Sequence, residues 1–218
     1  PETKFALGFA PYQGAAGTLA RFVQYETFQT AFYYLGLGLA GMPYMGVGRN
    51  LAYRRAFFFQ HQGFGPHHYL AAGDDDLLVN RLATARNTAV VLAPESFTWT
   101  PAPPSYKQWL YQKRRHLSIG QFYQPVHKLI LGSLWLLQVL FYLSLLGALL
   151  LDPANPLGWT LLGLKVVGFY SISLPVLRRF QMRPMAGWAF CLDLIYQLLY
   201  TPFIGLLARF QRNPGSWQ

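Results

Sequence analysis

Residues 129–151 read LILGSLWLLQVLFYLSLLGALLL and contain no charged side chain. A helix of about 20 apolar residues is long enough to cross the hydrocarbon core of a bilayer. Inside that core every backbone N–H and C=O group must be paired within the protein, and a helix achieves this by itself. The run therefore predicts a transmembrane helix, and the rest of the chain has to be arranged around it.

A second apolar segment, residues 157–177, is similar in length but contains Lys165, Pro175 and several glycines. We expect it to cross the membrane with Lys165 directed against protein, because a charged side chain is unfavourable in lipid. The connecting residues 152–156 contain no Lys or Arg, whereas Lys128 precedes the first segment and arginines follow the second. By the positive-inside rule, the first half of the chain then faces the cytoplasm.

A third apolar segment, residues 185–208, contains Asp193 and Pro202 and runs into Arg209 and Arg212. A simple third crossing would place these arginines on the outer side. A helical hairpin that breaks near Pro202 would return them to the cytoplasmic side. The pattern leaves both arrangements open and favours the hairpin.

The composition agrees with a membrane protein. Of 218 residues, 53% are hydrophobic and 12% are charged, about half the charged share of an ordinary soluble domain. Many basic residues flank the apolar segments, so the net charge of +10 indicates contact with a lipid surface and no nucleic-acid partner. A single cysteine, Cys191, excludes a disulfide or a thiolate metal site within the chain. Pro1, in place of an initiator Met, predicts that the chain is a fragment of a longer protein.

Residues 1–125 differ from the remainder, because short apolar runs alternate with Gly and Pro. We expect an α/β domain over 1–125 and a helical membrane region over 126–218. In the first of the expected helices, residues 18–35, the apolar spacing gives one face that packs against protein or touches lipid. The expected elements are a helix over 18–35, a strand or short helix within 50–59, a helix over 75–85, a strand over 88–92 and a helix over 106–117 with Ser105 as its N-cap.

The sequence Gly73-Asp74-Asp75-Asp76 opens one of these helices. Three adjacent carboxylates repel one another, which raises the pKa of at least one and favours a general base or a cation site. The alternative is structural, because acidic side chains at a helix N-terminus are stabilised by the helix dipole. The triplet alone leaves both interpretations open.

Gln112 and Arg115 lie three residues apart in the sequence QKRRH, on a helix that leads towards the membrane. This spacing places both side chains on one helical face, where they are able to reach a diphosphate together. A basic cluster beside a membrane also binds anionic headgroups. The pair becomes informative when it is considered with the acidic triplet.

Taken together, these motifs resemble those of the family 2 glycosyltransferases, membrane-bound inverting enzymes that include the cellulose, chitin and hyaluronan synthases. Gly73-Asp74-Asp75-Asp76-Leu77 is similar to the acidic motif of that family, and Asp75 falls at the position of its catalytic base. Gln112-x-x-Arg115-His116 is similar to the family's Gln-x-x-Arg-Trp motif, with His116 in place of Trp. Residues 46–55 and 62–64 are similar to the segment that precedes the acidic motif. The resemblance covers roughly the first 125 residues.

The resemblance implies the acceptor-side part of a GT-A-like domain, followed by transmembrane helices. Its expected partners are a nucleotide-sugar donor, a saccharide or lipid-linked acceptor and the lipid bilayer. It also implies a divalent cation, Mg or Mn, whose ligands belong to a nucleotide-binding half that is not in this chain, so that the chain alone should not hold the donor. The implied location is a bacterial inner membrane with the catalytic part in the cytoplasm. The implied site residues are Asp75 as general base with Asp74 beside it, and Gln112, Arg115, His116, Arg49 and Gly73 around the donor diphosphate and acceptor.

Two other interpretations remain. The chain is also compatible with a non-catalytic membrane scaffold or transport subunit, in which Asp75 and Arg115 are structural. It is also compatible with an enzyme of another type that uses His67 and His68 with the acidic triplet to hold a metal. Adjacent histidines point in different directions on most backbones, which disfavours that metal site. For Arg49, the structural alternative is an ion pair with Glu26 or Asp74.

Overall fold

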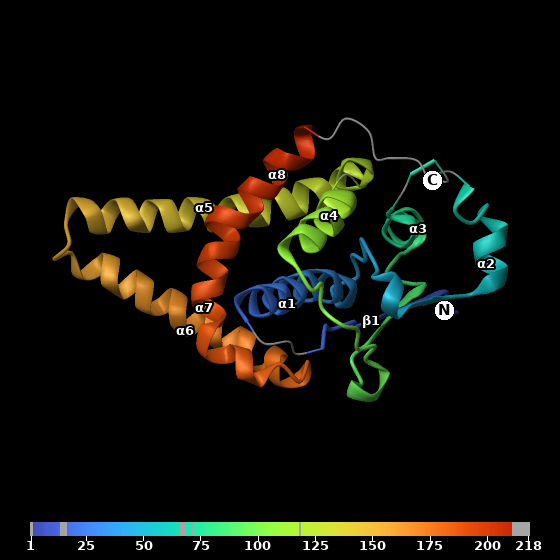
Figure 1. Cartoon of the computed structure of the whole chain (residues 1–218), viewed down its shortest axis with the longest axis horizontal. Coiled ribbons are helices and arrows are strands. Elements are labelled where there is room, and N and C mark those ends of the chain that lie inside the picture. The colour runs from blue at the N-terminus through green and yellow to red at the C-terminus, as the bar shows by residue number, and fades with distance from the viewer. Residues whose placement is uncertain (1, 14–16, 66–68, 71, 118, 211–218) are drawn as a thin grey trace. The chain divides into compact units, whose positions relative to one another are not determined.

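The computed structural model describes residues 2–13, 17–65, 69–70, 72–117 and 119–210. The chain forms two compact units. Unit 1 comprises Pro1–Pro125 with Phe203–Gln218, and unit 2 comprises Val126–Pro202. The main division therefore follows Pro125, where the composition changes in the sequence, and the C-terminal residues group with unit 1. Figure 1 shows the order of the elements along the chain by colour.

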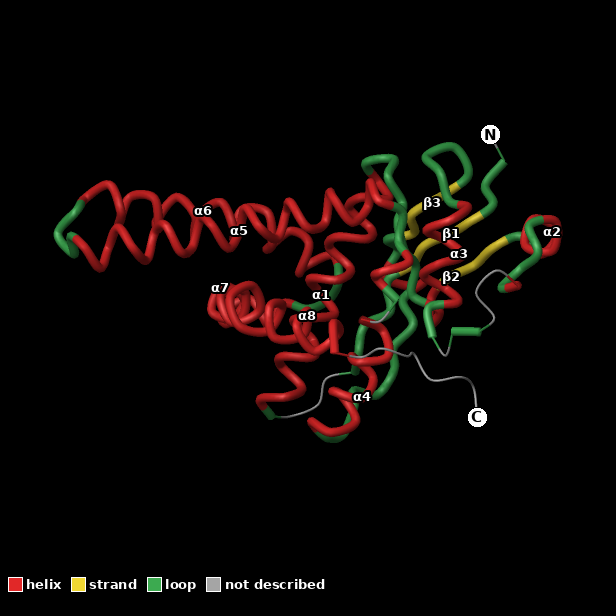
Figure 2. The backbone as a smooth tube through the Cα atoms, turned by 90° about the horizontal axis from the view of Figure 1, so that it is seen from above, coloured by secondary structure: helices red, strands yellow, loops and turns green. Residues whose placement is uncertain are grey.

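Unit 1 is built on a small mixed sheet in the order β2-β1-β3. β1 (Phe5–Gly8) lies in the middle, antiparallel to β2 (Leu51–Tyr53) and parallel to β3 (Thr88–Val91). Figure 2 shows the three strands side by side. Leu7 is fully buried on β1 and pairs with both outer strands. The strand expected over 88–92 is confirmed, and the ambiguous region 50–59 contains both a strand and a short helix, α2 (Arg55–Gln60).

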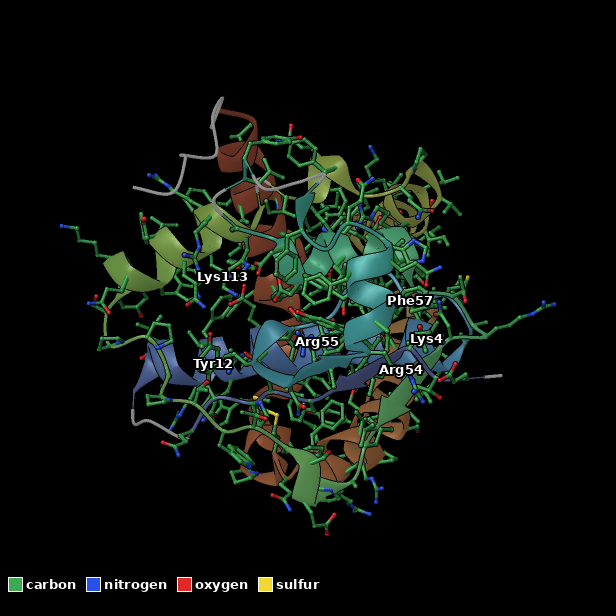
Figure 3. All side chains as sticks on the ribbon, turned by 90° about the vertical axis from the view of Figure 1, so that its right-hand side faces the viewer. Lys4, Tyr12, Arg54, Arg55, Phe57 and Lys113 are labelled. Carbon is green, nitrogen blue, oxygen red and sulfur yellow. The ribbon has the colours of Figure 1, made fainter. Side chains whose placement is uncertain are left out.

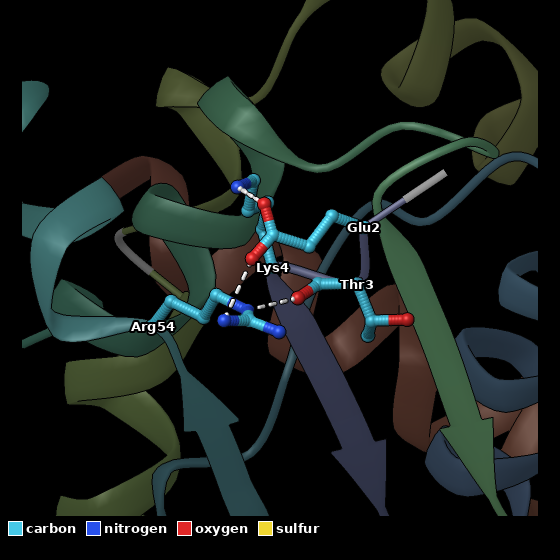
Figure 4. A network of polar contacts seen from close by, with 4 residues as sticks. All are labelled: Glu2, Thr3, Lys4 and Arg54. Carbon is cyan, nitrogen blue, oxygen red and sulfur yellow. Dashed lines mark hydrogen bonds and ion pairs between the residues drawn. The ribbon is translucent and has the colours of Figure 1, made fainter.

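The end of β2 is fastened to the start of β1 by Arg54. Its backbone N–H donates to the carbonyl oxygen of Lys4 at 2.9 Å, and its Nε donates to that of Thr3 at 2.7 Å. Glu2 forms ion pairs with Lys4 at 2.6 Å and Arg54 at 2.7 Å (Figure 4). These charges are exposed, so the ion pairs add little stability. The backbone bonds define the edge of the sheet.

The long helix α1 (Thr18–Leu39) packs against β1 and β3. The helix expected over 18–35 is confirmed and extends by about one turn. Its buried residues include the apolar Val23 and Phe28 and also the polar Glu26 and Gln29. Tyr34 donates a hydrogen bond of 2.6 Å from its buried hydroxyl to the carbonyl oxygen of Gly8. Of the two expected roles of its apolar face, packing against protein is the one observed.

Helices α3 (Asp74–Leu82) and α4 (Tyr106–Leu117) carry the motifs singled out in the sequence. The predicted bounds of α4 are confirmed, and the Ser105 side chain accepts a hydrogen bond from the backbone N–H of Gln108 at 3.3 Å, as an N-cap does. Short helical turns complete the unit: η1 (Gly48–Asn50), η3 (Pro94–Ser96) and η4 (Gly120–Phe122).

Three helical segments are long and apolar enough to cross a membrane: Pro125–Leu151, Pro156–Arg179 and Ala186–Leu206. The first two are α5 and α6, at the positions that the sequence predicts. After η5 (Arg183–Met185), the third consists of α7 (Ala186–Ile195), a π-helical turn η6 (Tyr196–Tyr200) and α8 (Thr201–Phe210). These three helices indicate that the chain associates with a membrane.

The helical hairpin that the sequence favoured for residues 185–208 is wrong, because the helix continues through Pro202. Proline removes a backbone donor and clashes with the preceding turn of an α-helix. Here a π-helical turn directly precedes it, and the Thr201 hydroxyl donates to the carbonyl oxygen of Tyr196 at 2.8 Å. The wider turn absorbs the proline without a break. Arg212 lies outside the described residues.

Polar side chains meet inside unit 2. Asp193 is buried and accepts hydrogen bonds from the Tyr142 hydroxyl at 2.7 Å and the Gln197 amide at 3.2 Å. Lys165 donates to the Gln138 side chain at 2.6 Å and lies 5.2 Å from the Tyr142 ring centroid. The prediction that Lys165 faces protein is thus confirmed. One polar cluster links α5, α6 and the third helical segment.

Candidate functional site

Gly73 places the acidic triplet at the start of α3. Its φ of +82° is a left-handed conformation that non-glycine residues rarely adopt. A Cβ atom at this position would also overlap the side chain of Ile119, which is fully buried. Glycine is therefore required for the chain to turn sharply into α3 while the segment after α4 packs over the turn.

Asp75 is held by backbone N–H groups. Its Oδ2 accepts from the backbone N–H of Gly48 at 2.5 Å, and its Oδ1 accepts from that of Asp76 at 2.9 Å. The side chain is only partly buried. Each carboxylate oxygen has two lone pairs, so Asp75 is fixed in position and still able to accept a proton from a ligand hydroxyl.

Gly48 makes this approach possible, because a Cβ atom there would lie 2.8 Å from Asp75 Oδ2. We expect Gly48→Ala to displace the carboxylate and to lower any activity that depends on it about tenfold, since misplacing a reacting group by about 1 Å is costly. The activity of membranes from cells that express the full-length protein measures this. Gly36→Ala is the matched control, because its Cβ would meet nothing within 4 Å. Equal activities of the two variants would contradict the role of Gly48.

The three carboxylates of the triplet have different surroundings. Asp74 is exposed, whereas Asp76 is buried and accepts a hydrogen bond from the Tyr123 hydroxyl at 3.3 Å. Burial, together with the neighbouring Asp75, raises the pKa of Asp76 well above its ordinary value. The sequence predicts a raised pKa somewhere in the triplet, and the structure assigns it to Asp76. That carboxyl group is inaccessible to a substrate, so Asp75 is the better placed base.

The segment that leads into α5 secures the far end of α3. Asn80 accepts from the backbone N–H of Gln124 at 2.8 Å and donates to the carbonyl oxygen of Tyr44 at 2.7 Å. The Gln124 amide donates back to the carbonyl oxygen of Asn80 at 2.6 Å. Because Ile119 also covers Gly73, residues from 119 to 124 hold α3 at both ends and so fix the position of Asp75.

Arg49, next to the residue that binds Asp75, extends towards α4. Its guanidinium lies 4.2 Å from the centroid of the Tyr12 ring and donates a hydrogen bond to the Thr100 hydroxyl. The Gln112 amide donates to the Tyr12 hydroxyl at 2.9 Å. Tyr12 therefore connects two of the predicted site residues, Arg49 and Gln112.

Glu26 is occupied elsewhere. It pairs with Lys113 at 2.8 Å and accepts from the Trp109 indole N–H at 3.1 Å, which fastens α4 to α1. The alternative ion pair of Arg49 with Glu26 or Asp74 is not found among the described residues. Figure 3 shows Lys113 and Tyr12 on the side of unit 1 that lies away from Lys4 in this view.

A cavity of about 840 Å³ opens beside these residues. Its lining includes Tyr12, Arg49 and Gln112, together with Thr100, the prolines that precede α4 and the first turns of that helix. Arg115 and His116 are not among the lining residues. Of the predicted site residues, Arg49 and Gln112 thus line the cavity. Asp75 is not among the lining residues but binds η1 next to Arg49, and Arg115 is exposed further along α4.

His116 replaces the tryptophan of the resembling motif and has different chemistry. Burial, with the nearby cations Lys113 and Arg115, lowers its pKa to about 4. The imidazole is therefore neutral near pH 7 and offers one donor and one acceptor, with less aromatic surface than an indole.

Tyr12, Thr100 and Lys107 belong to the cavity but were not predicted. Tyr12 follows β1, and only the fold brings it to residue 100, with which it forms an isolated bridge. No group of three or more His, Cys, Asp or Glu side chains suited to a metal occurs in the described part of the chain. The two histidines considered for a metal site, His67 and His68, lie outside the described residues.

No protein-family model matches the chain, and no curated protein matches it.

Proposed function

We propose that this chain is the acceptor-side part of an inverting glycosyltransferase that works at a bacterial inner membrane, with unit 1 in the cytoplasm. One observation carries the proposal. Gly48 holds the Asp75 carboxylate by a hydrogen bond of 2.5 Å, and the next residue, Arg49, lines a cavity together with Gln112. A candidate base and a candidate anion-binding group are thus joined by one short turn, in a chain that also contains helices apolar enough to cross a membrane.

The reaction would be a single displacement at the anomeric carbon of a nucleotide sugar. The acceptor oxygen forms the new bond as the bond to the nucleoside diphosphate breaks, and the diphosphate leaves with the electron pair. Asp75 takes the proton of the attacking hydroxyl, which requires a carboxylate within hydrogen-bond reach. Gln112 and Arg115 would stabilise developing negative charge on the diphosphate. A bound divalent cation would add charge neutralisation of the same kind.

The direct test is sugar transfer by the full-length protein in isolated membranes. Each of a panel of radiolabelled nucleotide sugars is supplied with Mg or Mn, and label is followed into lipid-extractable and polymeric products. We expect one donor to give incorporation above that of membranes without the protein, with inversion at the anomeric carbon. Absence of incorporation from every donor, with the protein present at normal level, would favour the scaffold or transport alternative.

A further inference from the structure

The cavity beside Arg49 has the size of a ligand site. Its volume of about 840 Å³ lies within the range of about 300–1,000 Å³ that is usual for small-molecule pockets. Its wall combines the aromatic ring of Tyr12 and several prolines with the polar side chains of Thr100 and Gln112. Such a wall suits a ligand that carries both a ring and polar groups.

The charged side chains that line the cavity are all basic. Arg49 and Lys107 line the cavity, and no Asp or Glu is among the lining residues. The Arg49 guanidinium is already oriented by Tyr12 and Thr100. In the described part of the chain Thr100 is its one recorded acceptor, so several of its five N–H groups remain for a ligand. The first turn of α4 adds the positive end of a helix dipole. This arrangement favours an anion.

The position of the cavity limits where that anion lies on a substrate. Gly48, which binds Asp75, and Arg49 are consecutive, so their Cα atoms are about 3.8 Å apart. An acceptor whose hydroxyl reaches Asp75 would therefore lie beside the cavity that Arg49 lines. If the attacking group were itself a phosphate oxygen, no general base would be needed, and Asp75 would have no role.

We propose that the cavity binds a phosphate or diphosphate carried by the acceptor sugar. This inference rests on the proposed function and makes its acceptor a phosphorylated saccharide, either free or lipid-linked. Arg49 forms charge-assisted hydrogen bonds to the phosphate oxygens in a planar fork, and Lys107 adds a point charge.

The test is a binding measurement that needs no turnover. Full-length protein in phosphatidylcholine nanodiscs is titrated calorimetrically with inorganic pyrophosphate, farnesyl diphosphate or the neutral methyl glucoside, with EDTA present to remove metals. We expect both diphosphates to bind, and Arg49→Gln and Lys107→Gln each to weaken their binding about tenfold. Lys107 has no recorded partner among the described residues, so its variant should fold normally. Methyl glucoside should bind equally to all variants.

Arg86→Gln is the matched control, because Arg86 is exposed in unit 1 outside the cavity lining. This variant should leave the affinity for diphosphate unchanged.

Tighter binding of farnesyl diphosphate than of pyrophosphate would support a lipid-linked acceptor. Equal binding of the two diphosphates would support a free sugar phosphate. Absence of diphosphate binding, or equal binding by all three variants, would overturn the inference. Transfer to a neutral acceptor without diphosphate binding would refute the cavity assignment alone, whereas Arg49-dependent binding without any transfer would refute the proposed function alone.

Discussion

Asp75→Asn is expected to lower sugar transfer by about 100- to 10,000-fold, the usual contribution of a general base. Asparagine has the same shape, and its carbonyl oxygen is able to keep the hydrogen bond from Gly48 although its NH2 group cannot accept the one from Asp76, so unit 1 should fold with only a small loss of stability. It is unable to accept the proton of the attacking hydroxyl. The loss should therefore appear in kcat, with little change in KM for the acceptor. Initial rates in membranes that contain matched amounts of each protein measure it.

Two companion variants make this result specific. Asp152→Asn makes the same chemical change in the exposed turn between α5 and α6 and should transfer sugar at the wild-type rate. Asp74→Asn tests the neighbouring exposed carboxylate. If it lost as much activity as Asp75→Asn, the assignment of the base within the triplet would be wrong. Full activity of Asp75→Asn would reject general-base catalysis by this residue.

Local signals were sufficient for several elements. The bounds of α4 follow from the prolines before it and from Ser105, whose side chain caps the first turn. The first two helices apolar enough to cross a membrane follow from long apolar runs, the second despite its Lys165 and Pro175. The third does not, because Pro202 ordinarily ends a helix and nothing local reveals that a π-helical turn accommodates it.

The candidate site was predictable only in part, because its members are brought together by tertiary contacts. The triplet presents three chemically equal carboxylates in sequence, and the fold alone makes Asp76 buried and Asp75 accessible. Tyr12, Arg49 and Gln112 come from distant parts of the chain, and they meet through a stacking contact and a hydrogen bond. No spacing rule connects such residues. The resemblance predicted Arg49 and Gln112, whereas Tyr12 had no local signal.

The polar cluster of unit 2 has a cause that can be tested by stability. A carboxylate within a membrane helix is strongly unfavourable unless polar partners surround it. Asp193 has such partners in Tyr142 and Gln197, both of which are buried. In return, the carboxylate accepts hydrogen bonds from a buried hydroxyl and a buried amide. The cluster therefore stabilises the association of α5 with the third helical segment.

Asp193→Ala is expected to lower the free energy of unfolding by about 2–3 kcal/mol, because it leaves two buried donors without their acceptor. This loss is at the lower end of the cost of leaving two buried donors without an acceptor, because polar groups in membranes also find partners in the unfolded state. Unfolding by SDS in mixed micelles, followed by tryptophan fluorescence, measures it. Asp193→Asn keeps an acceptor and should lose less than about 1 kcal/mol, and Asp152→Ala, in an exposed turn, should be neutral. Wild-type stability of Asp193→Ala would show that the cluster does not hold these helices together. The acidic side chain in this apolar helical segment would then require a different physical explanation.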